Sequence, residues 1–191
     1  MVAVLRLGTT ERGITEIMGT AEHTVSIAAA AAALRLRADV PEPVASDREL
    51  VDASAPPPGE TRRVLEEIGT WSNETLGVGH VPAFWRALAR KPRLLEAVWA
   101  KHRLVLGAGE LGADLKLAVA LAVAANKQSD YWAAYFAQWA RTSAGFDDET
   151  FVEISGAVLH YTAFNTISHG MMLEAPHRDI SAADFASEDA P

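Results

Sequence analysis

Two adjoining stretches decide the fold of this sequence: LKLAVALAVAA at positions 115–125 and DYWAAYFAQW at positions 130–139. The first is apolar on every side except at Lys116, so a helix here belongs in the centre of a bundle or at a subunit contact. The second follows a capping serine and repeats aromatic residues at helical spacing. Two successive helices so rich in apolar side chains predict an all-α protein.

Helical patterns extend on both sides of this pair. They cover residues 9–36, 60–68, 81–89, 92–106 and 147–173, and few stretches show the alternation that strands require. Prolines crowd residues 38–59 and prevent a helix there. We therefore expect four parts: an N-terminal helix (1–37), a proline-rich linker (38–59), a helical domain (60–175) and an acidic tail (176–191).

Composition excludes several classes of protein. The chain of 191 residues has a net charge of -8 and no cysteine, so it forms no disulfide, thiolate nucleophile or thiolate metal site. An acidic balance argues against nucleic acid or an anionic membrane as a partner. No secretory signal pattern and no apolar run of membrane-spanning length is found. We expect a soluble, cytoplasmic protein.

The sequence contains an internal repeat. A shift of 137 positions lays residues 8–38 over residues 145–175, and both copies contain the pattern Glu-Ile-x-Gly-x-x-x-His, which ends at His23 and at His160. This similarity predicts two copies of one helical unit. We expect Gly19 and Gly156 to permit close helix approach, with each histidine one turn later on the same side.

A family resemblance rests on four pieces of the sequence. They are VPAFWRALA at 81–89, LLEA at 94–97, the apolar helix at 117–125, and GFDDE at 145–149. Over residues 56–175 the chain resembles the carboxymuconolactone decarboxylase and alkylhydroperoxidase D-like family. The resemblance implies a helical bundle of that type, in which the extra N-terminal helix looks like the closing helix of a second unit.

The residues that serve the peroxidase branch of that family are missing. That branch is similar in carrying a Cys-x-x-Cys-x-x-x-His run and a glutamate on the preceding helix. The corresponding positions here are Ser129, Trp132, Phe136 and Leu117. A serine cannot form the disulfide of a thiol peroxidase and a leucine relays no proton, so this activity is excluded. The decarboxylase branch needs no thiol, and we expect an activity without a cofactor.

Two histidines and one glutamate are the candidate catalytic residues. His23 and His160 each lie mid-helix among apolar residues, and they would face one cavity if the two helices pack about a pseudo-twofold axis. Alternatively, each is a core histidine that a neighbouring hydroxyl of Thr20, Thr24 or Tyr161 satisfies. Glu22 suits acid–base work if burial raises its pKa, although such a residue more often reaches solvent or an arginine.

Other polar and aromatic residues are candidates for substrate binding. Tyr161, Asn165 and His169 share one face of the last helix, which alternatively is a solvent face or a hydrogen-bonded oligomer contact. Asp130 and Tyr135 lie where the family keeps its reactive groups, although Asp130 also suits a helix start. Trp132 belongs to an aromatic set that forms core first and a ligand wall second.

Metal binding finds little support in this sequence. None of the histidines forms a His-x-x-x-His pair, and no acid stands beside one in a ligand spacing. Phosphate loops and nucleophile elbows are absent too. His80, His102 and His177 have the surroundings of surface or loop residues. We expect no metal.

Two functions remain open. The leading hypothesis is a cofactor-independent enzyme that applies acid–base chemistry (lyase, isomerase or ring-opening) to a small organic substrate. The alternative is a non-catalytic small-molecule-binding or assembly protein on the same fold. An enzyme should have a cavity lined by converging polar groups, whereas in the alternative Trp132 and Phe136 should fill that space. A homo-oligomer is expected in both cases, because the apolar and aromatic helices present more hydrophobic surface than one small bundle can bury.

Overall fold

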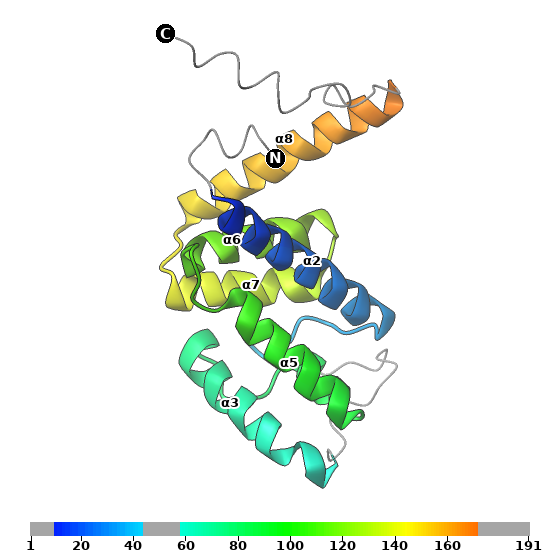
Figure 1. The fold of residues 1–191 in the computed structure, drawn as a ribbon, viewed down its shortest axis with the longest axis vertical. Helices are drawn as coiled ribbons and strands as arrows, with labels where there is room; N and C mark the ends of the chain where they lie inside the picture. Colours follow the sequence, from blue (N-terminus) through cyan, green and yellow to red (C-terminus); the bar gives the residue numbers. More distant parts are fainter. Residues whose placement is uncertain (1–9, 44–57, 172–191) are drawn as a thin grey trace. The chain divides into compact units, whose positions relative to one another are not determined.

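Residues 10–43 and 58–171 are described by a computed structural model of the chain, and within these ranges it contains helices and no strand. The predicted all-α class is confirmed. The helices follow in the order α2 (Glu11–Ala33), the 3-10 turn η1 (Gly59–Thr61), α3 (Arg62–Leu76), α4 (Ala83–Leu88), α5 (Pro92–Leu106), α6 (Ala113–Asn126), α7 (Asp130–Ser143) and α8 (Asp148–Gly170) (Figure 1).

The chain divides into two compact units, residues 1–158 and residues 159–191, and each is described by itself. Helix α8 begins in the first unit and ends in the second. The predicted acidic tail, 176–191, lies outside the described residues, as does most of the predicted linker. The four-part division of the chain therefore stays a prediction.

Local sequence signals account for the helix ends. The side chain of Thr10 caps α2 by accepting a hydrogen bond from the Gly13 N–H at 3.0 Å. Pro92 occupies the first turn of α5, where its missing N–H costs nothing. Helix α3 ends at Gly77 with φ +69°, a left-handed conformation that favours glycine. It runs eight residues beyond the predicted end at 68.

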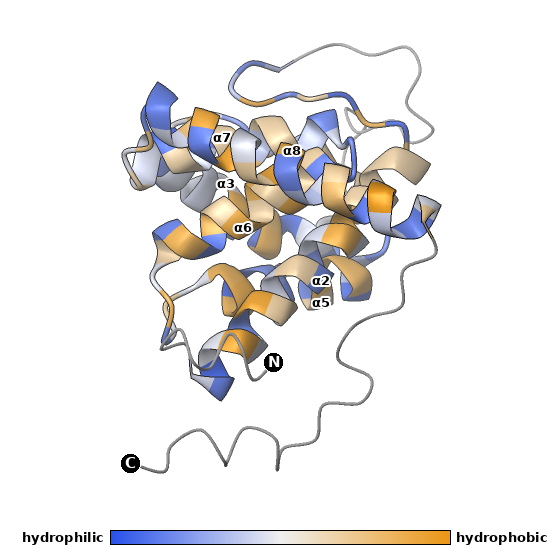
Figure 2. Cartoon of the chain, turned by 90° about the horizontal axis from the view of Figure 1, so that it is seen from above, coloured by the Kyte–Doolittle hydropathy of each residue, from blue (hydrophilic) through white to orange (hydrophobic). Residues whose placement is uncertain are grey.

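Helix α6 packs chiefly against α2 and α7 (Figure 1). Hydrophobic residues cover most of its surface (Figure 2). The buried side of α6 consists of Lys116, Leu117, Ala120, Leu121 and Ala124. On its other side Ala118, Val119, Ala122 and Val123 are only half-buried, so α6 is buried along one side, and the choice between the bundle centre and a subunit contact stays a prediction.

The segment after α2 belongs partly to the core. Asp39 and Val40 are 2% and 5% exposed, although both fall in the predicted linker. Asp39 Oδ2 accepts a hydrogen bond from the Ala83 N–H at 2.6 Å, so the chain that leaves α2 is fixed to the first turn of α4. The prolines after α2 prevent the helix from continuing, but Asp39 and Val40 still pack against the bundle.

Helices α2 and α8 have the bounds that the internal repeat predicts. Glu11 and Ala33 become positions 148 and 170 after a shift of 137, and these are the ends of α8. The expected role of the shared glycine is wrong, because a Cβ at Gly19 or at Gly156 would meet nothing within 4 Å. Among the residues that the structure describes, no neighbouring helix approaches either glycine closely.

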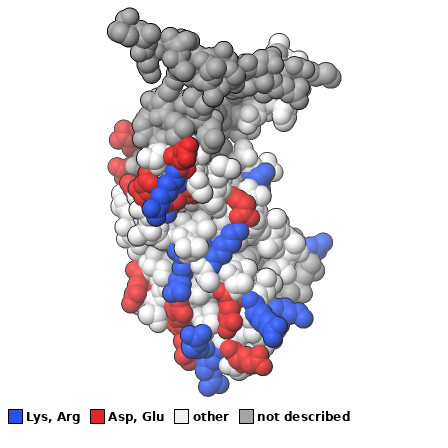
Figure 3. Space-filling model, viewed as in Figure 1, with Lys and Arg blue, Asp and Glu red and all other residues white. Residues whose placement is uncertain are grey.

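The surface of the described residues carries charges of both signs. On the face shown in Figure 3, basic and acidic side chains alternate instead of gathering by sign. None of the helices in ranges 10–43 and 58–171 is long and apolar enough to cross a membrane.

Candidate functional site

Two histidines from different helices meet inside the bundle. His23 Nε2 of α2 lies 3.1 Å from His102 Nδ1 of α5. Both side chains are buried, at 1% and 0% exposed. His23 is thus one of the candidates, and its partner is a histidine rather than a hydroxyl, since Thr20 and Thr24 donate to carbonyl oxygens of their own helix.

Burial keeps this histidine pair uncharged at neutral pH. Loss of solvent lowers the pKa of His23 to about 4, with a smaller contribution from the nearby charge of Lys101. The same cause holds the pKa of His102 well below 6.5. A bond between two neutral imidazoles needs one N–H donor and one lone-pair acceptor, so the tautomer of either ring fixes that of the other.

All five tryptophans of the sequence surround His102. Their rings come from α3, α4, α5 and α7, and the ring of Tyr135 completes the cluster. The distances from ring centroid to the His102 ring are 5.1 Å for Trp85, 5.8 Å for Trp99 and Trp139, 5.9 Å for Trp71 and Tyr135, and 6.1 Å for Trp132. We call these seven residues the tryptophan cluster; together they seat one imidazole among aromatic rings.

Three polar atoms of the tryptophan cluster have no hydrogen-bond partner among the described residues. They are His102 Nε2, Trp85 Nε1 and Tyr135 Oη, and all three side chains are 0% exposed. Burial raises the pKa of the Tyr135 phenol, while the neighbouring Trp85 lowers it by a smaller amount. The Trp85 effect is a hydrogen-bonding interaction of its indole N–H with the Tyr135 oxygen, too poor in geometry to count as a full hydrogen bond. Buried polar groups are normally paired, so His102 Nε2 is the atom of the cluster whose hydrogen-bonding capacity is unmet among the described residues.

A surface pocket of about 310 Å³ adjoins the tryptophan cluster. It lies between α3 and α5, and its lining is Glu67, Thr70, Trp71, Glu74, Trp99 and Arg103. We call it the α3–α5 pocket. Trp71 and Trp99 meet edge to face with centroids 5.4 Å apart, and both also contact the His102 ring. These two indoles therefore separate the pocket from the buried imidazole.

The rim of the α3–α5 pocket is acidic. Glu67 Oε1 accepts hydrogen bonds from Trp99 Nε1 at 2.9 Å and pairs with Arg103 at 2.6 Å. The guanidinium of Arg103 also lies 5.8 Å from the centroid of Trp99. Glu74 has no cationic partner within residues 10–43 and 58–171. Two carboxylates and one guanidinium leave the rim with one net negative charge.

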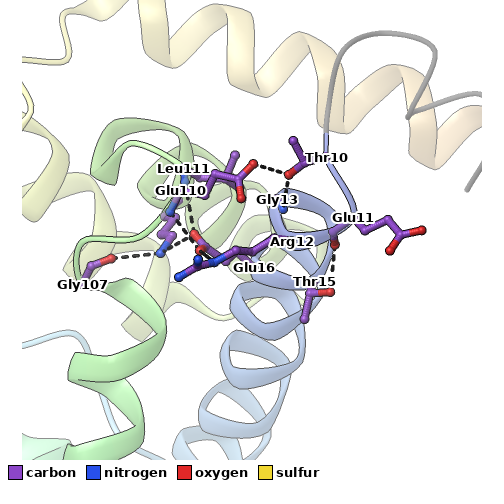
Figure 4. A network of polar contacts seen from close by, with 10 residues as sticks. Thr10, Glu11, Arg12, Gly13, Thr15, Glu16, Gly107, Glu110 and Leu111 are labelled. Carbon is purple, nitrogen blue, oxygen red and sulfur yellow. Dashed lines mark hydrogen bonds and ion pairs between the residues drawn. The ribbon is translucent and has the colours of Figure 1, made fainter.

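A second polar network fixes α2 to the loop before α6 (Figure 4). The Glu16 carboxylate accepts the N–H groups of Glu110 and Leu111 at 2.9 and 3.1 Å, and it pairs with Lys116 at 2.9 Å. These bonds, the one from the Glu110 N–H foremost, lower the pKa of Glu16 to about 2. Lys116 also donates to the Gly107 carbonyl at 2.9 Å. The network clamps two elements together and satisfies a buried lysine.

A third network gathers around Asp39. Its Oδ2 atom lies 3.4 Å from the Arg86 guanidinium, and the His80 imidazole donates to its backbone carbonyl at 2.8 Å. The Tyr131 hydroxyl accepts the Phe84 N–H at 2.9 Å, and burial holds the Tyr131 pKa well above 10. Both this network and that of Glu16 tie a loop to the start of a helix.

The residues at the family's reactive positions are part of the core. Trp132 and Phe136 are 0% exposed, and Trp132 donates its indole N–H to the Ile27 carbonyl at 2.9 Å. Tyr135 is buried with them. Asp130 is exposed in the first turn of α7. The structure thus brings Trp132 and Tyr135 together with His102 and leaves Asp130 at the surface.

Glu22 does not enter the histidine site. Its side chain is 60% exposed and pairs with Lys101 at 2.5 Å. That hydrogen bond lowers the pKa of Glu22. Of the two alternatives that the sequence left open, the structure therefore has the glutamate that reaches solvent, and not the buried carboxylate with a raised pKa. The physical reason is the helix itself, since Glu22 points about 100° away from the buried His23.

The other candidates lie in the second unit. His160, Tyr161, Asn165 and His169 are exposed, and the His160 ring contacts the rings of Tyr161 and Phe164. The stripe on α8 that the sequence predicts is therefore present. The convergence of His160 and His23 on one cavity stays a prediction, because the two histidines lie in units that are described separately.

The expectation for the remaining histidines is wrong at one position and untested at another. His102, expected at the surface, is fully buried in the tryptophan cluster. His80 is half-buried, and His177 lies outside the described residues. The signal that was available for His102 is its spacing from Trp99, since positions i and i+3 share a helix face. No sequence signal marks Asp39, whose partners are distant in sequence.

Comparison with known proteins reveals one similarity of fold. No protein-family model matches the chain, and no curated protein matches it. A crystal structure of the alkylhydroperoxidase AhpD core from Rhodospirillum rubrum is similar, with a TM-score of 0.56 and 22% sequence identity. The match covers 70% of this chain and 96% of that one. The chain therefore has the fold of the AhpD core.

Proposed function

We propose that this protein binds a small organic cation with an apolar body in the α3–α5 pocket, and that it is not a catalyst. The observation that carries the proposal is that two members of the tryptophan cluster, Trp71 and Trp99, line that pocket and also contact the His102 ring behind it. Two indoles with an acidic rim are the chemistry that binds an ammonium or amidinium group attached to a flat apolar body.

The filled core supports binding over catalysis. An enzyme on this fold would need a cavity at the positions where the family resemblance puts reactive groups. Trp132 and Phe136 occupy that space and are fully buried, which was the arrangement expected of a non-catalytic relative. The only imidazoles in the neighbourhood, His23 and His102 among the described residues, are paired with each other and out of contact with solvent.

The charge of the rim selects the sign of the ligand. Glu67 is already engaged by Arg103, whereas Glu74 is available to face a cation at the pocket mouth. Trp71 is half-buried, so part of its ring is open to the pocket. A cation over an indole face gains about 0.5–2 kcal/mol, and an anion at the same place is repelled. Shape and charge together therefore favour cationic aromatic ligands.

The test is a calorimetric titration of the full chain with three probes of one size. Benzyltrimethylammonium should bind, benzyl alcohol should bind more weakly, and benzenesulfonate should not bind. Trp71→Ala should weaken the first probe about tenfold or more, and Glu74→Gln should weaken it several-fold. Glu66→Gln is the matched control, because Glu66 lies on the same helix but lines a different pocket. Equal affinity for all three probes, or no effect of Trp71→Ala, contradicts the proposal.

A second candidate function rests on the unpaired Nε2 atom of His102. A neutral imidazole with an open nitrogen, held by His23, is the arrangement of a general base. In this alternative the protein is a cofactor-independent acid–base enzyme, and Trp71 and Trp99 would have to part to admit the substrate. Ring opening of a panel of small lactones, followed by NMR, tests it: His102→Gln must abolish turnover while helicity is kept. A turnover that survives this substitution excludes His102 as the base.

A further inference from the structure

Helix α3 borders a second pocket, on a different side from the α3–α5 pocket. This second pocket has a volume of about 480 Å³, which is within the range of small-molecule sites. The residues of α3 that line it follow the spacing i, i+3, i+4 and i+7 and so share one side of the helix: Arg62, Leu65, Glu66 and Gly69. Pro58 and Gly59, before α3, and Val81, before α4, complete the lining. We call it the Arg62 pocket.

The apolar part of this lining is aliphatic. Leu65 is buried and belongs to the core, and the half-buried Val81 packs against the core. Gly69 leaves room between them, because a Cβ at this position would already lie 3.4 Å from Cγ2 of Val81. No aromatic side chain is among the described residues that line the pocket. The Arg62 pocket therefore suits a compact aliphatic group, whereas the two indoles of the α3–α5 pocket suit a flat one.

Arg62 and Glu66 bring one charge of each sign to the pocket. Both side chains are exposed, and neither has an ion-pair partner among the described residues. They stand four positions apart, but a base that precedes an acid is the less favourable order for pairing along a helix. Both charges are therefore available to a ligand, and because their sum is zero the pocket favours a ligand that itself carries both signs.

We propose that the Arg62 pocket binds an α-amino acid with an aliphatic side chain, in its zwitterionic form. The ligand carboxylate pairs with the guanidinium of Arg62, whose planar fork matches a carboxylate, and the ligand ammonium pairs with Glu66. The aliphatic side chain packs against Leu65 and Val81, in the space that Gly69 leaves. An ion of one sign would satisfy only one of the two charged residues and would be repelled by the other. The proposal does not depend on the α3–α5 pocket or on its ligand.

NMR titration of the full chain tests the site and the class of ligand. Low ionic strength is used, because salt screens exposed charges. L-Leucine should shift the backbone amides of Leu65, Gly69 and Val81 until the shifts saturate. Isopentylamine lacks only the carboxylate and 4-methylpentanoate lacks only the ammonium, so each should bind several-fold more weakly than L-leucine. The absence of saturable shifts at these three amides, or equal affinity for the three probes, overturns the proposal.

Variants test the assigned contacts, and circular dichroism verifies that each keeps its helicity. Arg62→Gln and Glu66→Gln should each weaken L-leucine several-fold. Arg63→Gln is the matched control, because Arg63 is also exposed on α3 but lines neither pocket. Gly69→Leu should abolish binding by filling the space, whereas Trp71→Ala, in the α3–α5 pocket, should leave the affinity unchanged. Equal weakening by Arg62→Gln and Arg63→Gln, or L-leucine binding that survives Gly69→Leu in a folded chain, overturns the proposal.

Discussion

His102 Nδ1 lies 3.1 Å from His23 Nε2, and this contact joins α5 to α2 across 79 positions of sequence. Both rings are buried, and the pKa of each is lowered by burial. The pair therefore contributes to stability in its neutral form. The pair also joins helix α2 to the tryptophan cluster. Protonation of either imidazole would therefore disturb the packing of both α2 and the cluster.

The first prediction concerns the stability of the protein in mild acid. Unfolded histidines bind protons below about pH 6.5, whereas the folded His23 does so only near pH 4. The contribution of the pair is therefore complete above pH 6.5 and is lost as the pH falls from 6.5 toward 4. Each histidine adds a slope of up to about 1.4 kcal/mol per pH unit to the free energy of unfolding. Urea unfolding between pH 4.5 and 8 measures the slope.

The control for this prediction is the double variant with His23→Gln and His102→Gln. Two amides can share a hydrogen bond and do not titrate, so the variant should show a flatter dependence over the same window. If the double variant and the unmodified chain have parallel profiles, the carboxylates alone cause the acid sensitivity.

A second prediction concerns Trp132. It is fully buried and donates to the Ile27 carbonyl, so Trp132→Ala should reduce the free energy of unfolding by about 3–5 kcal/mol. Trp132→Phe should cost less, because it keeps most of the buried ring. Trp139→Ala is the comparison, since Trp139 is only half-buried and leaves a smaller cavity. Chemical denaturation should give Trp132→Ala the largest loss in the free energy of unfolding of the three variants. A Trp132→Ala variant as stable as the unmodified chain would refute the close packing of the cluster.

A third prediction concerns Asp39. Asp39→Ala removes the acceptor of the Ala83 N–H and the partner of Arg86, both near the buried start of α4. The expected loss in the free energy of unfolding is about 2–4 kcal/mol. Asp39→Asn keeps an acceptor oxygen and should lose less. Hydrogen exchange of the Ala83 amide measures its hydrogen bond to Asp39 directly. Exchange of this amide should be faster in Asp39→Ala. An unchanged exchange rate would show that the hydrogen bond does not stabilise the start of α4.

A fourth prediction concerns the clamp between α2 and α6. Glu16→Ala leaves Lys116, which is 3% exposed, without its carboxylate and should lower the melting temperature by several degrees. Lys116→Met replaces the buried cation by an apolar chain of similar length and should be milder. The Glu16 contribution is present above pH 4.5 and is lost as the pH falls toward 2. Calorimetry of both variants at pH 7 measures the order, and the reverse order would mean that the lysine is stabilising by itself.

The helices could be predicted from the sequence because their signals are local. Apolar periodicity, prolines and glycines identified α5, α6 and α7 within a few residues. The serine predicted to cap α7, Ser129, does stand at the N-cap, but its side chain forms no cap hydrogen bond. Helix α3 was predicted eight residues too short, because its last turns carry a tryptophan and polar residues instead of a regular apolar pattern. Tertiary packing, with Leu76 fully buried, extends this helix where local pattern is weak.

The candidate site could be predicted only in part because it is made by contacts between distant residues. His23 was a sound candidate, since a histidine among apolar residues on a packed face needs a partner. Its partner was missed because Lys101 and Arg103 flank His102 and give the local sequence a surface character. A helix buries one residue in three or four, so charged neighbours say little about the residue between them.

The gathering of every tryptophan around one imidazole has a spectroscopic consequence. Indole emission depends on solvent and on nearby quenching groups, and here all five emitters share the same surroundings. The intrinsic fluorescence of the chain is therefore a signal from a single place in the fold. Protonation of the imidazole, or occupation of the space beside Trp71, would change that emission without any label.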